Sequence, residues 1–224
     1  ISMDRAGPTT TALVGRHQEL AELADALARV RAGQGSLFLL TGEPGIGKTR
    51  LADELASLAR AATVRGLWGR CHEAAGRPPY FPWVQIVQAH LRDADPATFA
   101  AALPADAIPF GLLVPELAPH LECAIAPVGA VESETARFRL FRALTAVFRQ
   151  IAATRALLLI LDDLHWADLP SLRLLEFIAH HLPEAPIVVV GTYREIEVRQ
   201  HPAVADIIDR LSRRGRQFPL AGFT

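Results

Sequence analysis

Apolar residues recur at helical spacing in several separate stretches of the chain. The first runs through Leu20, Leu23, Leu27 and Val30 and ends at Gly33. The same spacing of three and four residues follows Thr49 and returns in 134–152, 170–182 and 203–211. Each stretch places its apolar positions on one face, which predicts amphipathic helices packed against a neighbouring layer.

Between these helices lie short runs that are apolar at nearly every position. They occupy 37–40, 64–68, 157–161 and 187–192, and a further run covers 218–220. Continuous apolar character between turn residues is typical of strands buried on both faces of a parallel sheet. Because these strands alternate with helices, the sequence predicts an α/β fold with a parallel sheet sandwiched by helices.

The segment from about 73 to 130 has a different texture, because prolines cluster there and no strand pattern is convincing. Short helices are predicted at 83–91 and 96–103. We interpret the segment as a helical, proline-rich insertion packed against the core. Its aromatic residues Tyr80, Phe81 and Trp83 either anchor the insertion to the core or form a ligand surface, and anchoring is the favoured interpretation.

Composition restricts the classes of partner. A chain of 224 residues with net charge −1 has no overall electrostatic footprint for nucleic acid. A cluster of arginines at 210, 213, 214 and 216 either forms a solvated helix end or contacts a phosphate backbone, and the helix end is favoured. No apolar stretch is long enough to span a bilayer and no signal-peptide pattern is present, so we expect no membrane partner.

Cysteine usage and the ends of the chain complete this picture. Cys71 and Cys123 have no metal-ligand spacing, and a reduced, cytoplasmic setting is the default. Residues 1–12 are expected to be a disordered leader or tag remnant, and 13–224 to be one domain. The chain stops directly after an apolar stretch, so we expect a domain excised from a longer protein.

One motif carries the candidate chemistry. Residues 42–49 read GEPGIGKT and match G-x-x-x-x-G-K-[ST], and Lys48 is the only lysine among the 23 lysines and arginines of the chain. A chain that otherwise uses arginine, yet has lysine here, indicates a need for a compact ammonium that fits between two phosphates. The motif also follows a predicted strand and precedes a predicted helix, which is the order of a P-loop. A glycine-rich turn with an incidental lysine is the alternative.

In a P-loop the glycines let backbone N–H groups converge on phosphates at a helix N-terminus. Lys48 is then expected to reach the β- and γ-phosphates, and the Thr49 hydroxyl to hold Mg²⁺. The predicted nucleotide-binding residues of this segment are Gly42, Glu43, Pro44, Gly45, Ile46, Gly47, Lys48, Thr49 and Arg50.

Two further strand ends carry polar residues. The run at 157–161 ends in Asp162 and Asp163, and ligands of parallel sheets gather at the carboxyl ends of strands. Asp162 is therefore predicted to hold Mg²⁺ with Thr49, and Asp163 to orient or deprotonate the attacking water. Arg194 follows the run at 187–192 and is predicted to contact the γ-phosphate. The alternatives are an ordinary strand-to-loop turn for the acidic pair and an exposed loop arginine.

The ordered set of motifs resembles the AAA-like ATPase domain of STAND-class signal-transduction proteins, in particular that of large LuxR-type and cyclase-linked multidomain regulators. The resemblance rests on VGR at 14–16, TGEPGIGKT at 41–49, PYFPW at 79–83, LDDLHWAD at 161–168 and GTYR at 191–194.

The resemblance implies an adenine-nucleotide switch that is inactive with ADP and opens or self-associates with ATP. It places Val14, Gly15 and Arg16 near adenine and ribose, and makes Arg194 a sensor arginine. It also implies that DNA is bound only through a helix-turn-helix domain absent from this chain. Asp163 stands where many AAA enzymes have glutamate, and this shorter side chain implies slow hydrolysis.

Other functions stay open at this point. An autonomous ATPase motor or a small-molecule kinase would need its own assembly or acceptor pocket. A nucleotide-gated oligomerisation module would bind ATP without turnover. A GTPase is disfavoured, because the guanine-reading N-K-x-D motif needs a second lysine and the chain has none.

Overall fold

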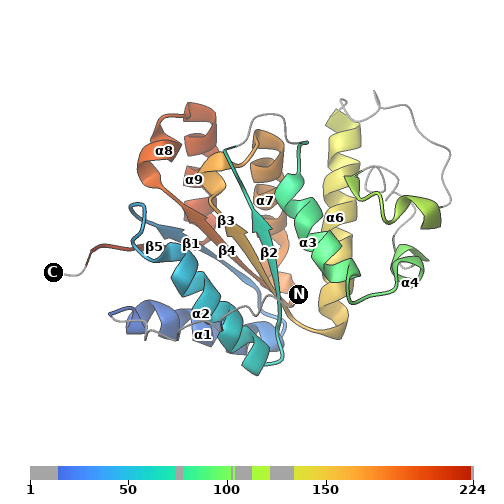
Figure 1. The fold of residues 1–224 in the computed structure, drawn as a ribbon, viewed down its shortest axis with the longest axis horizontal. Coiled ribbons are helices and arrows are strands. Elements are labelled where there is room, and N and C mark those ends of the chain that lie inside the picture. The colour runs from blue at the N-terminus through green and yellow to red at the C-terminus, as the bar shows by residue number, and fades with distance from the viewer. Residues whose placement is uncertain (1–14, 74–77, 102, 104–112, 122–133, 223–224) are drawn as a thin grey trace, which may run out of the picture.

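The computed structural model describes residues 15–73, 78–101, 103, 113–121 and 134–222. Five parallel strands form one sheet, in the order β2-β3-β4-β1-β5 (Figure 1). Their bounds are β1(Ser36–Thr41), β2(Arg65–Arg70), β3(Leu157–Asp162), β4(Ile187–Tyr193) and β5(Arg216–Pro219). This parallel arrangement confirms the predicted fold class.

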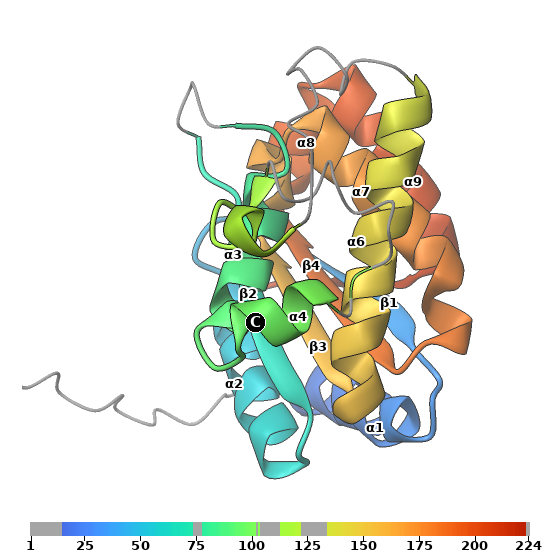
Figure 2. The same ribbon diagram turned by 90° about the vertical axis from the view of Figure 1, so that its right-hand side faces the viewer.

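Helices cover both faces of the sheet (Figure 1). One face carries α1(His17–Arg31) and α2(Lys48–Ala61), and the other carries α3(Phe81–Leu91), α6(Glu134–Thr154), α7(Leu169–His181) and α9(Pro202–Arg214). Viewed from the side of α6, the helices α3 and α6 lie in front of the sheet (Figure 2). The shorter helices are α4(Pro96–Ala101), α8(Glu195–Arg199) and the 3₁₀ turns η2(Ala118–His120), η4(Leu164–Trp166) and η5(Leu182–Glu184).

The central strands β1, β3 and β4 are largely apolar because each one contributes to two cores. In β3, Leu157 and Leu159 pack with the α6 and α7 side, whereas Leu158 and Ile160 pack with the α1 and α2 side. Successive side chains of a strand point to opposite faces, so a strand covered on both faces has no position for a polar residue until it ends. This explains why Asp162, at the end of β3, is the strand's first polar residue.

The described residues between β2 and α6 are helical or irregular and contain no strand. Trp83 is the anchor of this segment: it is 1% exposed, its ring lies 5.5 Å from that of Phe148, and its Nε1 donates to the Ser171 carbonyl at 3.2 Å. The aromatic cluster therefore packs into the core. The bounds of the insertion, 73–130, stay a prediction, since several of its residues lie outside the described ranges.

The C-terminal arginines mostly contact neighbouring groups of the protein itself. Arg210 pairs with Glu176 and Asp206, Arg216 pairs with Glu22, and Arg214 contacts His180. These contacts favour the helix-end interpretation over a phosphate-backbone contact.

Within the described ranges, no helix is both long and apolar enough to cross a membrane.

Two predicted features have a simple structural outcome. Cys71 is buried and free, and burial raises the pKa of its thiol, which makes it unreactive. Cys123 and the predicted leader at 1–12 lie outside the described residues.

Candidate functional site

The glycine-rich loop connects the carboxyl end of β1 to the first turn of α2. Gly45 and Gly47 have φ of 76° and 101°, a region that residues with a Cβ rarely adopt. A Cβ on Gly42 would lie 2.6 Å from the Leu220 carbonyl oxygen, so that position has no room for a side chain. The loop therefore depends on its glycines, and the free N–H groups at the start of α2 form an anion-binding end.

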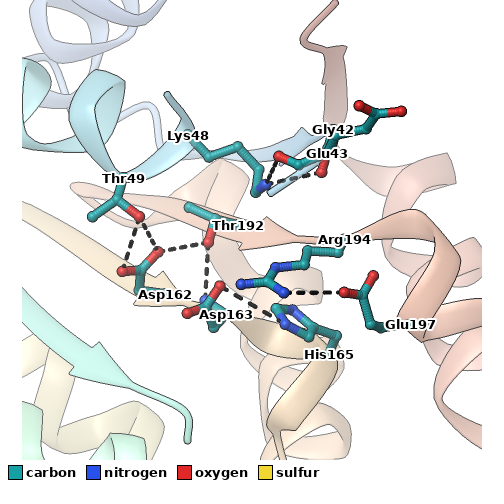
Figure 3. A network of polar contacts seen from close by, with 10 residues as sticks. All are labelled: Gly42, Glu43, Lys48, Thr49, Asp162, Asp163, His165, Thr192, Arg194 and Glu197. Carbon is teal, nitrogen blue, oxygen red and sulfur yellow. Dashed lines mark hydrogen bonds and ion pairs between the residues drawn. The ribbon is translucent and has the colours of Figure 1, made fainter. Parts of the chain in front are cut away.

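Lys48 lies inside this loop rather than in solvent. Its Nζ donates to the carbonyl oxygens of Gly42 at 2.8 Å and Glu43 at 2.9 Å (Figure 3). Burial lowers the pKa of Lys48, and the positive charge of Arg194 lowers it further. The ammonium is thus held by backbone carbonyls at the mouth of the anion-binding end, where phosphate oxygens are stronger acceptors.

Thr49, Asp162 and Thr192 form a connected line across three elements (Figure 3). Thr49 Oγ1 lies 3.2 and 3.3 Å from the two Asp162 carboxylate oxygens, and the Thr192 hydroxyl donates to Asp162 Oδ1 at 2.6 Å. Asp162 and Thr192 are buried. A hydroxyl and a carboxylate fixed in this way form an oxygen-donor pair, the chemistry that Mg²⁺ prefers when phosphates and waters complete its shell.

Asp163 follows directly after Asp162, the last residue of β3. Its backbone is left-handed, with φ of 59°, and its N–H donates to Thr192 Oγ1 at 2.9 Å. The charges of Asp163 and Arg194 both act on the pKa of Lys48, so the three groups share one region of the site. Arg194 in turn pairs with Glu197 at 3.1 Å.

His165 lies behind Asp163, with Nε2 3.9 Å from Asp163 Oδ1. Its side chain is buried, and neither ring nitrogen has a hydrogen-bond partner among the residues that the structure describes. Burial lowers the pKa of this imidazole, so it is neutral near pH 7. Trp166 is half-buried and packs against the core, consistent with a packing role.

The segment predicted to lie near the base is only partly described, since Val14 lies outside the described residues. Arg16 is buried and donates to the Ala221 carbonyl, and it pairs with Glu19 at 3.3 Å. Next to Ala221, the Leu220 N–H donates to the Thr41 carbonyl at 2.8 Å, at the start of the glycine-rich loop. Gly15 borders a cavity of about 490 Å³ that is also lined by Phe218 and Pro219. Gly15 and Arg16 therefore lie at the same end of the sheet as the loop.

A comparison with known families decides the class of this site. The family described as AAA ATPase domain matches residues 12–190, which is most of the chain. The chain belongs to the AAA ATPase domain family. Membership supports a P-loop nucleotide-binding domain and is consistent with the loop, the acidic pair and the parallel sheet described above.

A solved structure agrees with this AAA ATPase fold. Cdc6p from Pyrobaculum aerophilum has a TM-score of 0.54 at 16% identity, over 96% of this chain and 47% of that one, which shows a common fold. A chain from the structure of Drosophila ORC bound to GC-rich DNA and Cdc6 gives a lower TM-score of 0.44 at 9% identity, over 99% of this chain and 64% of that one.

A curated relative is also similar in sequence. An uncharacterized protein of Rhizobium meliloti (strain 1021) is 30% identical over 195 residues, which cover 81% of this chain and 18% of that protein. This chain thus spans about a fifth of the length of that relative.

Sequence reasoning missed Thr192 as a member of the site. Part of the signal was present, since a hydroxyl residue ends the apolar run that begins at Ile187. What was missing is the pairing of β3 with β4, which brings the Thr192 hydroxyl onto Asp162. In the AAA ATPase domain this residue belongs with the loop and the acidic pair.

Proposed function

We propose that this AAA ATPase domain is a Mg²⁺-dependent switch that binds ATP and hydrolyses it slowly, within a multidomain signal-transduction or transcriptional regulator. The observation that carries the proposal is the line from Thr49 through Asp162 to Thr192, set beside Lys48. Three elements converge to fix one carboxylate and one hydroxyl at the N-terminus of α2. Such precision is expected where a metal–phosphate group has to be held.

In this proposal Thr49 and Asp162 hold Mg²⁺, which neutralises phosphate charge when bound. Lys48 releases the Gly42 and Glu43 carbonyls and moves onto the β- and γ-phosphates. The loop's backbone N–H groups, from Gly42 to Thr49, surround the phosphates, and Arg50 flanks them. Gly15 and Arg16, with Val14, take the base and ribose; the cavity beside Gly15 supports this placement.

Slow turnover follows from Asp163. An aspartate reaches less far than a glutamate, and its left-handed backbone, with φ of 59°, fixes where the carboxylate starts. Asp163 orients or deprotonates the attacking water less efficiently as a result. Arg194, which acts on the charge of Lys48, reports the γ-phosphate by exchanging Glu197 for phosphate oxygens.

The regulatory part of the proposal rests on the motif resemblance and on the length of the relative, of which this domain is a fifth. A change in Arg194 and Lys48 contacts between ATP and ADP would drive opening or self-association in a cytoplasmic protein. DNA would be bound only by a helix-turn-helix domain elsewhere in the regulator.

Nucleotide affinity tests the proposal directly. We expect ATP and ADP to bind, GTP to bind more weakly, and ATP binding to depend on Mg²⁺, all measured by calorimetry on the purified domain. Lys48→Ala should abolish ATP binding while the circular-dichroism spectrum and the Tm stay unchanged. ATP affinity that is the same in Lys48→Ala, or the same without Mg²⁺, would contradict the roles given to Lys48, Thr49 and Asp162.

Because Lys48 is the only lysine, chemical labelling gives a second readout. An amine-reactive reagent should modify Lys48 and the N-terminus, and MgATP should protect Lys48 alone. Phosphate release from ATP, measured in parallel, distinguishes a hydrolysing switch from a module that binds without turnover.

A further inference from the structure

In the described part of the chain, the strand β2 forms one edge of the sheet and pairs with β3 alone. The Arg65 N–H donates to the Ala156 carbonyl and the Cys71 N–H to the Asp162 carbonyl, so every second residue from Arg65 onward faces β3. Backbone groups alternate in direction along a parallel strand. The N–H and C=O groups of Gly66, Trp68 and Arg70 therefore point away from the sheet.

One of these three outward positions is already occupied. The carboxamide of Gln85, on α3, accepts from the Arg70 N–H at 3.0 Å and donates to the Arg70 carbonyl at 3.3 Å. These are the two hydrogen bonds that a neighbouring strand would make. No described residue makes the corresponding bonds to Gly66 or Trp68, so within the described ranges this part of the edge is open.

The open edge lies at the bottom of a groove. Figure 1 shows β2 between α2 and α3. A cavity of about 520 Å³ lies along Gly66, Leu67 and Trp68, with Ala56 and Arg60 on the α2 side and Ala89 and Arg92 on the α3 side. We call this the β2-edge groove. Small alanine side chains on both walls leave space beside the strand for another extended chain, which needs about 4.8 Å between strand axes.

The β2-edge groove is strongly basic, although the chain as a whole has net charge −1. Four arginines and one aspartate line it, namely Arg60, Arg65, Arg92, Arg155 and Asp93. Arg65 pairs with Asp93 at 3.0 Å, and Arg155 donates to the Thr63 carbonyl at 2.6 Å. Arg60 and Arg92 are exposed and have no partner among the described residues. The groove thus has unmatched positive charge above unmatched backbone hydrogen-bonding groups.

We propose that the β2-edge groove binds an extended acidic segment of another polypeptide, which adds as a strand beside Gly66 and Trp68. The backbone of the segment bonds the outward groups of β2, and its carboxylates face Arg60 and Arg92. Anions that lack a strand-forming backbone satisfy only half of this site. The groove lies away from the carboxyl ends of the strands, so the segment and a nucleotide can be bound together.

A fluorescent peptide tests the proposal on the purified domain. The probe is an alternating Glu/Val peptide of about eight residues, a common strand length, and binding is followed by anisotropy. A Lys/Val peptide is the charge control. Two further Glu/Val peptides are N-methylated at every second backbone nitrogen, one at the odd-numbered residues and the other at the even-numbered residues. In an added strand only one set faces β2, so one methylated peptide should lose binding about tenfold or more and the other should keep it.

Variants of the protein locate the site. The double variant Arg60→Glu with Arg92→Glu should weaken binding of the Glu/Val peptide about tenfold. The control is Arg31→Glu with Arg139→Glu, which makes the same change of net charge at exposed positions elsewhere. It should change the affinity for the peptide by less than about twofold. Gly66→Pro removes one outward N–H without touching the β3 ladder, and a Cβ there meets only Ala56 Cβ at 4.0 Å. It should also weaken the peptide. ATP affinity measured on every variant shows that the fold survives.

Any of three results would overturn the proposal. The first is that the Glu/Val peptide fails to bind a domain that binds ATP normally. The second is that both methylated peptides bind like the parent peptide, which would indicate charge attraction alone, and the third is that the Arg60/Arg92 variant binds the peptide as tightly as the Arg31/Arg139 control does. Full competition by inorganic tripolyphosphate together with equal binding of the methylated peptides would identify a simple anion site instead.

Discussion

The Thr192 hydroxyl donates a hydrogen bond of 2.6 Å to Asp162 Oδ1 and accepts one of 2.9 Å from the Asp163 N–H. One side chain on β4 therefore holds the carboxylate of the first aspartate and the backbone of the second. The same carboxylate contacts Thr49. Thr192 is a positioning residue, and its effect on the proposed chemistry passes through Asp162 and Asp163.

Thr192→Val keeps the shape of the side chain and removes the hydroxyl. Asp162 loses a donor and the Asp163 N–H is left without a partner, so we expect ATP hydrolysis to fall about 10- to 100-fold and the free energy of unfolding to fall by about 1–3 kcal/mol. Steady-state phosphate release and denaturant unfolding measure the two effects. Thr192→Ser retains the hydroxyl and should keep most of the activity. Wild-type turnover in Thr192→Val would show that this hydrogen bond does not position the acidic pair.

Asp163→Asn separates the charge of Asp163 from its backbone requirement. Asparagine tolerates the left-handed conformation almost as well as aspartate, so the fold should be unaffected. We expect hydrolysis to fall about 100-fold because the water-orienting carboxylate is gone, with ATP still bound. Single-turnover hydrolysis and calorimetric ATP affinity are the measurements. Asp163→Ala, by comparison, should also lose about 1 kcal/mol of stability from backbone strain. Unchanged single-turnover rates in the asparagine variant would remove Asp163 from the mechanism.

Local patterns explain why the fold and the loop could be predicted. The central strands β1, β3 and β4 are buried on both faces, so their apolar runs are visible in the sequence. Gly45 and Gly47 have backbone angles that select for glycine. The role of Asp162 could be predicted because this residue stands at the end of an apolar run. Each of these features depends on a few neighbouring residues.

The missed features depend on contacts between distant residues. The strand order β2-β3-β4-β1-β5 is not implied by the order along the chain, and Thr192 joins the site only because β4 lies beside β3. The edge position of β2 and the bonds of Gln85 to Arg70 follow from the same order. The five-residue helix α8 is too short to show a helical period.

The pKa of Lys48 predicts how ATP affinity depends on pH. In the nucleotide-free domain, burial and the charge of Arg194 lower this pKa below the ordinary value for lysine. Phosphate contacts favour the protonated form. Above the lowered pKa the free lysine is neutral and has to take up a proton on binding, so affinity should fall by up to about tenfold per pH unit. Calorimetry at constant MgATP speciation, from about neutral pH to the lysine range, measures this fall.

Two variants check the assignment to Lys48. Any weak binding left in Lys48→Ala should show no fall in this range. Arg194→Gln removes a neighbouring positive charge, which raises the pKa of Lys48 and should move the fall to higher pH. A shift to lower pH would contradict the sign of this interaction.

Asp168 links the inserted segment to the core and is predicted to act on stability alone. Its carboxylate caps α7, accepting from the Ser171 N–H at 2.8 Å and the Ser171 hydroxyl at 2.7 Å, and it also accepts from the Tyr80 N–H at 3.4 Å. Asp168→Ala removes all three bonds, so we expect a loss of about 1–2 kcal/mol in the free energy of unfolding. Urea unfolding followed by tryptophan fluorescence measures the loss.

Asp168→Asn is the matched control, because its amide oxygen can still accept from the Ser171 N–H while the negative charge is lost. It should recover most of the stability that Asp168→Ala loses, since the cap needs an acceptor more than a charge. ATP affinity should be the same in both variants, because Asp168 makes no contact with Lys48, Thr49 or Asp162 among the interactions described. A large loss of ATP affinity in folded Asp168→Ala would show that the last aspartate of LDDLHWAD belongs to the nucleotide site.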